Sequence, residues 1–102
     1  MSYVYDVIIN RHTKLKPDIV IYYDEDPKLS IKVMGDYVRK NGFTVKEEGK
    51  TYSIATLVLR KRTPTGKIIN EMMYHELFDT ITGEEKKNAV ELIEKAGGEN
   101  DD

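Results

Sequence analysis

The stretch TYSIATLVLRKR, Thr51–Arg62, is the longest strand signal in the chain. The segment EEGK at residues 47–50 predicts a hairpin turn before it, and TPTG at residues 63–66 predicts another turn after it. We therefore expect a neighbouring strand on each side, over Phe43–Glu48 and over Lys67–Leu77. Helix is the alternative for the second half of the later segment, because Glu, Met and Leu all favour helix.

Two further strand signals precede these three. Tyr3–Arg11 has apolar residues at both alternating sets of positions, which indicates an interior strand or one whose second face meets a partner. Asp18–Asp24, DIVIYYD, is rich in β-branched and aromatic residues and predicts a second strand. The polar segment RHTKLKP at residues 11–17 is typical of a connection.

A helix is expected at about Pro27–Lys40. Pro27 suits the first turn of a helix, where its missing N–H costs nothing, and Asp26 can cap the free amide groups. The pair Asn41-Gly42 predicts the end of this helix in the left-handed conformation. The segment TGEEKKNAVELIEKAGG at residues 82–98 predicts a second helix, with a capping box formed by Thr82 and Glu85.

The order strand, strand, helix, three strands, helix predicts an α+β fold: a mainly antiparallel sheet of about five strands with two helices packed on one face. The length suits one domain, residues 1–97, followed by a frayed acidic tail at 98–102. Two helices would leave part of so apolar a sheet uncovered. A homodimer would cover it; the alternative is that the aromatic residues belong to the core.

The composition limits the class of protein. The 102 residues include 16 basic and 18 acidic ones, a net charge of −2, which argues against a protein built around a strong nucleic-acid-binding field. The absence of cysteine excludes a disulfide framework, a thiolate metal site and a cysteine nucleophile. No apolar run is long enough to cross a membrane, and no signal-peptide pattern is present, so we expect no membrane partner.

One enzymatic pattern occurs in outline. Pro17-Asp18, followed later by Glu48-Gly49-Lys50, resembles the carboxylates and lysine of a metal-dependent nuclease. That pattern needs the glutamate and the lysine side by side within a strand, whereas EEGK is typical of a turn. The two histidines give no zinc-protease motif either, because Asp79 stands where the second histidine after His75 is required.

A basic hairpin offers a second alternative. Arg60, Lys61, Arg62 and Lys67 lie close to the predicted TPTG turn and could contact phosphate groups. Strand alternation, however, places Arg60 and Arg62 on one face and Lys61 on the other. The ordinary interpretation is a solvated hairpin end that resists aggregation.

Acidic clusters offer the third possibility. Asp24, Glu25 and Asp26 stand together at the expected corner between strand and helix, and Glu47 and Glu48 stand at the expected hairpin turn. Carboxylates held on a rigid surface can dock on a protein groove lined by Lys and Arg. We select these five residues as candidate contacts with a partner protein; a simple charged surface is the alternative.

The strands SYVYDVIIN and DIVIYYDED, the capped helix that follows them and the later hairpin resemble the small anti-CRISPR proteins of rod-shaped archaeal viruses. The resemblance spans most of the chain and rests on composition and element order. It implies a dimeric α+β protein in the host cytoplasm that disables a CRISPR interference complex through the large subunit of that complex. It also implies no catalytic residues and no cofactor, and it assigns no role to any individual residue.

Overall fold

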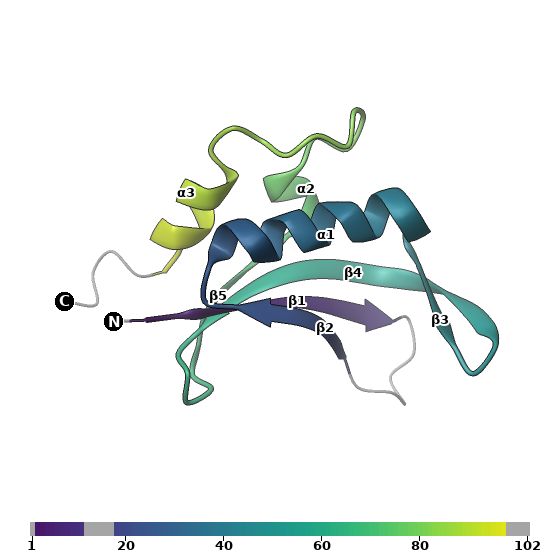
Figure 1. The fold of residues 1–102 in the computed structure, drawn as a ribbon, viewed down its shortest axis with the longest axis horizontal. Coiled ribbons are helices and arrows are strands. Elements are labelled where there is room, and N and C mark those ends of the chain that lie inside the picture. The colour runs from purple at the N-terminus through teal and green to yellow at the C-terminus, as the bar shows by residue number, and fades with distance from the viewer. Residues whose placement is uncertain (1, 12–17, 98–102) are drawn as a thin grey trace.

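A computed structural model describes residues 2–11 and 18–97 and confirms the predicted α+β class (Figure 1). The predicted connection at residues 12–17 and the predicted tail at residues 98–102 lie outside the described residues. The elements are β1 Val4–Arg11, β2 Ile19–Asp24, α1 Pro27–Asn41, β3 Thr44–Glu47, β4 Lys50–Arg62, β5 Ile68–Met73, α2 Tyr74–Leu77 and α3 Ala89–Lys95.

The longest strand, β4, pairs with three others, and every pairing is antiparallel. Its residues 54–62 pair with β1, whose other edge carries β2. Residues 50–53 of β4 pair with β3, and residues 58–62 pair with β5. The strand predicted to be the longest is therefore the one that joins the sheet together.

The helices all lie on one side of this sheet (Figure 1). Alternate residues of β1, Tyr5, Val7 and Ile9, belong to the core on that side. The residues between them, Asp6 and Ile8, point to the other side because successive side chains of a strand alternate. We call this second side, which no helix of the described chain covers, the open face.

Helix α1 begins and ends as the sequence predicts. The side chain of Asp26 accepts a hydrogen bond from the Lys28 amide, and Pro27 opens the first turn. Gly42 ends the helix with φ of 64°, and its amide donates to Val38. Gly35 lies in the middle of the helix because a Cβ there would stand 2.7 Å from the buried ring of Phe78.

The second predicted helix is wrong in its first half. No helix forms at residues 82–88, and α3 begins only at Ala89. The carboxylate of Asp79 instead accepts hydrogen bonds from the Ile81 and Thr82 amides, and Gly83 turns with φ of 75°. Phe78 then pairs with Glu85 as an isolated bridge, so Glu85 cannot complete the capping box.

The segment after β5 adopts the alternative that the sequence left open. The strand stops at Met73 and one helical turn, α2, follows at Tyr74–Leu77. The carboxylate of Glu76 accepts a hydrogen bond of 2.8 Å from the Met73 amide, which satisfies a backbone donor at the start of the turn. The ring of Tyr74 stacks on Phe78 at 4.6 Å between centroids, fixing α2 to the core.

Lys61 is buried on the helix side of β4, with 1% of its surface exposed. Its ammonium donates hydrogen bonds to the carbonyls of Glu94 and Ala96 at the end of α3. It also lies 4.4 Å from the centroid of the Tyr3 ring. A cation at the C-terminal end of a helix satisfies free carbonyls and complements the helix dipole, so this side chain fastens α3 to the sheet.

We expect Lys61→Met to destabilise the fold by about 1–3 kcal/mol, because it removes the donor from two carbonyls and retains most of the apolar stem. Urea unfolding followed by circular dichroism measures the change. The control is Lys67→Met, an exposed lysine near the hairpin turn, which should change stability by less than about 0.5 kcal/mol. Equal effects of the two substitutions would contradict the anchoring role.

Candidate functional site

Asp24, Glu25 and Asp26 form the corner between β2 and α1, which we call the acidic corner. Asp24 accepts a hydrogen bond from the Tyr22 hydroxyl at 2.7 Å and another from the Asp26 amide at 2.8 Å. Asp26 caps α1. Glu25 is exposed, and its carboxylate has no hydrogen bond or ion pair within the described chain. Two of the three acids thus hold the corner in shape, while the third faces solvent.

These hydrogen bonds shift the titration of both partners. The Asp26 amide and then the Tyr22 hydroxyl stabilise the ionised carboxyl, so the pKa of Asp24 is lowered from its ordinary 3.8. The hydrogen bond to Asp24 raises the pKa of Tyr22 in turn. Asp24 therefore keeps its negative charge at lower pH values than an ordinary aspartate does.

A recess of about 320 Å³ opens beside Glu25. We call it the corner recess. It joins the start of β1, the first turn of α1 and the end of α3, so no local pattern in the sequence could have revealed it. Its lining residues are Ser2, Tyr3, Tyr5, Glu25, Pro27 and Glu94.

Glu47 and Glu48 lie at the far end of the sheet from the acidic corner. Tyr5 stands opposite Asp24, whereas Arg11, six residues further along β1 and so about 20 Å away, forms an ion pair with Glu47. Glu48 is exposed in the hairpin turn with φ of 52°. The five acidic residues predicted to contact a partner therefore form two separate groups. In the second group, Glu47 is already paired with Arg11 of the same chain.

The four cations of the predicted basic hairpin have separate environments. Arg60 pairs with Glu71 and Arg62 pairs with Asp6, each at 2.7 Å, while Lys61 is buried on the opposite side. Lys67 alone of the four is exposed without an ion pair in the described chain. The structure does not bring these cations together as one phosphate-binding tip.

The nuclease candidates are also apart. Asp18 accepts a hydrogen bond from Asn10 beside β2, whereas Glu48 and Lys50 belong to the hairpin between β3 and β4. Two strands, β1 and β4, separate β2 from β3 in the sheet. At the usual strand spacing this is a separation of about 14 Å, too far for one metal ion.

The open face carries an apolar row that crosses the sheet. In the strand register Val20 stands opposite Ile8, Ile8 opposite Val58, and Val58 opposite Met73. The outer residues of this row are the exposed ones, Val20 at 49% and Met73 at 38%. Ile8 is buried and Val58 is half-buried, so the exposed apolar surface of this row lies on the outer strands β2 and β5. Exposed apolar side chains on a sheet face mark a candidate surface for contact with another chain.

The neighbouring row on the open face is charged. It contains Tyr23, Asp6, Arg60 and Glu71, with Tyr23 66% exposed. The Asp6 side chain is 4% exposed; Oδ2 meets Arg62, whereas Oδ1 is buried without a hydrogen-bond partner in the described chain. The open face thus combines apolar surface with paired charges of both signs.

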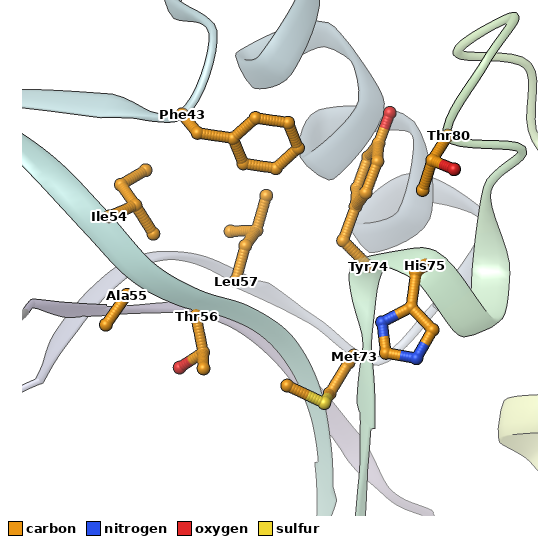
Figure 2. A pocket seen from close by; sticks show the side chains of 9 residues that line it. All are labelled: Phe43, Ile54, Ala55, Thr56, Leu57, Met73, Tyr74, His75 and Thr80. Atoms are coloured by element: carbon orange, nitrogen blue, oxygen red, sulfur yellow. The ribbon is translucent and has the colours of Figure 1, made fainter.

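A second hollow, of about 220 Å³, lies beside β4 between the part that pairs with β3 and the part that pairs with β5. Figure 2 shows Phe43, Leu57 and Tyr74 around it, with the imidazole of His75 at its rim. The rings of Phe43 and Tyr74 meet edge to face at 5.3 Å. The walls are mainly apolar, and Tyr74 and His75 are the titratable side chains among the described residues that line the hollow.

No group of three or more His, Cys, Asp or Glu side chains that could hold a metal ion occurs within residues 2–11 and 18–97. No helix in these two ranges is long and apolar enough to cross a membrane. Comparisons with protein-family models, curated proteins and solved structures found no match.

We expect Tyr22→Phe to raise the pKa of Asp24 towards 3.8, because it removes one of the two main hydrogen bonds to the ionised carboxyl. Carboxyl-detected NMR titration measures this value, and Tyr23→Phe is the control. A carboxyl group whose pKa is lower in the folded state stabilises the fold at pH values above its pKa in the unfolded chain. This contribution is lost as the pH falls through the pKa of the folded state. The stability difference between wild type and Tyr22→Phe should therefore be present at neutral pH and vanish in acid; an unchanged Asp24 titration would contradict this.

Proposed function

We propose that this chain is a non-enzymatic binding protein that acts by contact with another protein. The observation that carries the proposal is the open face, where the apolar side chains of Val20 on β2 and Met73 on β5 remain exposed. The acidic corner supports it, because two internal hydrogen bonds and a helix cap hold its charges in fixed positions. Preorganised charge of this kind favours specific association.

The two surfaces have separate roles in this proposal. The open face pairs with a second copy of the chain, because its mixture of apolar residues and charges of both signs suits a self-complementary contact. The corner recess lies on the helix side, where Tyr5 and Pro27 line it. A dimer formed through the open face would leave one acidic corner on each copy available to the partner.

The identity of the partner comes from the resemblance of the strands SYVYDVIIN and DIVIYYDED to viral anti-CRISPR proteins. On that basis the proposed partner is the large subunit of a CRISPR interference complex in the cytoplasm of an archaeal host. A subunit that binds nucleic acid presents Lys and Arg, which complement the acidic corner. Inhibition would then follow from occupation of that surface.

The two alternatives have less support. A nuclease would need Asp18, Glu48 and Lys50 in one site, and two strands separate them. A nucleic-acid-binding regulator would need the hairpin cations free, and two of them pair with Glu71 and Asp6. Tight, salt-sensitive binding to plain DNA would nevertheless favour the regulator, and cleavage that Glu48→Ala abolishes would favour the nuclease.

We expect the purified chain to sediment as a dimer and Val20→Lys to weaken the dimer at least about tenfold, because it places a charge in the apolar row. Sedimentation equilibrium across a dilution series measures the dissociation constant. The matched control is Leu29→Lys, which replaces an equally exposed residue on α1, 45% against 49%. A monomeric wild type, or equal weakening by both substitutions, would show that the open face is not the dimer contact.

We expect the tagged chain to capture a CRISPR interference complex from a lysate of archaeal cells that contain one, with the large subunit identified by mass spectrometry. Glu25→Lys should reduce capture about tenfold, because it reverses a charge in the contact without removing the cap or the Asp24 hydrogen bonds. Glu84→Lys, an exposed glutamate elsewhere, is the control. Capture without any CRISPR subunit would refute the partner, and undiminished capture by Glu25→Lys would refute the site.

A further inference from the structure

We propose that the corner recess binds one guanidinium or ammonium group. The two carboxylates that line it, Glu25 and Glu94, come from different elements, the β2–α1 corner and α3. Neither carboxylate has a hydrogen bond or an ion pair within the described chain. A charged donor placed between them would form charge-assisted hydrogen bonds to both.

Tyr5 gives an independent reason to expect a ligand in this recess. Only 5% of its surface is exposed, and the residue lines the recess, but its hydroxyl has no hydrogen-bond partner among the described residues. Burial, followed by the charge of Glu94 and the proximity of Tyr3, raises the pKa of Tyr5. An N–H donor bound in the recess would give this hydroxyl the hydrogen-bond partner that it lacks among the described residues.

The charge of the surroundings selects the ligand. The Lys61 ammonium donates to the main-chain carbonyl of Glu94, and the described residues that line the recess include two carboxylates and no cationic side chain. Two carboxylates without an internal partner among the described residues attract one guanidinium or ammonium group. An anion would be repelled by both carboxylates.

The group is supplied by an Arg or Lys side chain of the partner protein, and this source of the ligand rests on the proposed function. Seating such a side chain beside Glu25 would give the acidic corner a defined pocket at its centre. Buried, desolvated arginines of this kind commonly dominate the energy of an interface.

The test needs no partner. The ¹⁵N-labelled chain is titrated with butylguanidinium, and amide shifts of Tyr3, Tyr5, Glu25 and Glu94 are followed by NMR. We expect saturable shifts with a dissociation constant of about 1–10 mM, the range expected of one small charged group. The uncharged analogue butylurea should produce no saturable shift at these amides.

Variants locate the contact while the spectrum itself reports folding. Glu25→Gln and Glu94→Gln should each weaken butylguanidinium binding about tenfold, and Tyr5→Phe, which keeps the ring, about threefold. Glu84→Gln should bind as wild type does. Equal binding of butylurea, absence of saturation, or undiminished binding by both glutamate variants overturns the inference. The butylguanidinium titration tests the recess and the capture experiment tests the partner. Failure of one of these experiments can therefore be distinguished from failure of the other.

Discussion

The antiparallel pairing of β1 with β4 is the contact on which the rest of the molecule depends. Each of the other three strands is attached to one of these two, β2 to β1 and both β3 and β5 to β4. The pairing also decides which residues face the helices, because a shift by one residue would exchange Val7 and Leu59 with the side chains of the open face. Core, open face and corner recess therefore follow from one register.

The same register separates three adjacent cations that the sequence presents as one basic run. Arg60 and Arg62 point to the open face, where Glu71 and Asp6 neutralise them, and Lys61 points inward to the end of α3. Residues consecutive in a strand cannot form a single positive surface, since alternate side chains project to opposite faces. A charge run on a strand is thus weaker support for phosphate binding than the same run on a loop.

Local signals predicted the local features of this fold. Asp26 and Gly42 mark the two ends of α1 as predicted, because a helix cap depends only on residues a few positions away in the sequence. The predicted capping box at Thr82 is wrong because the Thr82 amide donates its hydrogen bond to the carboxylate of Asp79, and Glu85 pairs with Phe78. The corner recess brings together residues almost ninety positions apart, such as Tyr5 and Glu94. Neither its existence nor the internal role of Lys61 has any signature within a short stretch of sequence.

The acidic corner shows how structural and binding roles divide among neighbouring residues of one charge. Asp24 and Asp26 use their oxygens to hold the chain where β2 ends and α1 begins, so they stabilise the position of the charge and have fewer lone pairs for a partner. Glu25 stands between them with both oxygens unused within the described chain, on backbone that its two neighbours fix. Fixing a contact group in advance lowers the entropy lost on binding. The residue with no structural role of its own is therefore the one best placed to meet a cationic side chain of a partner.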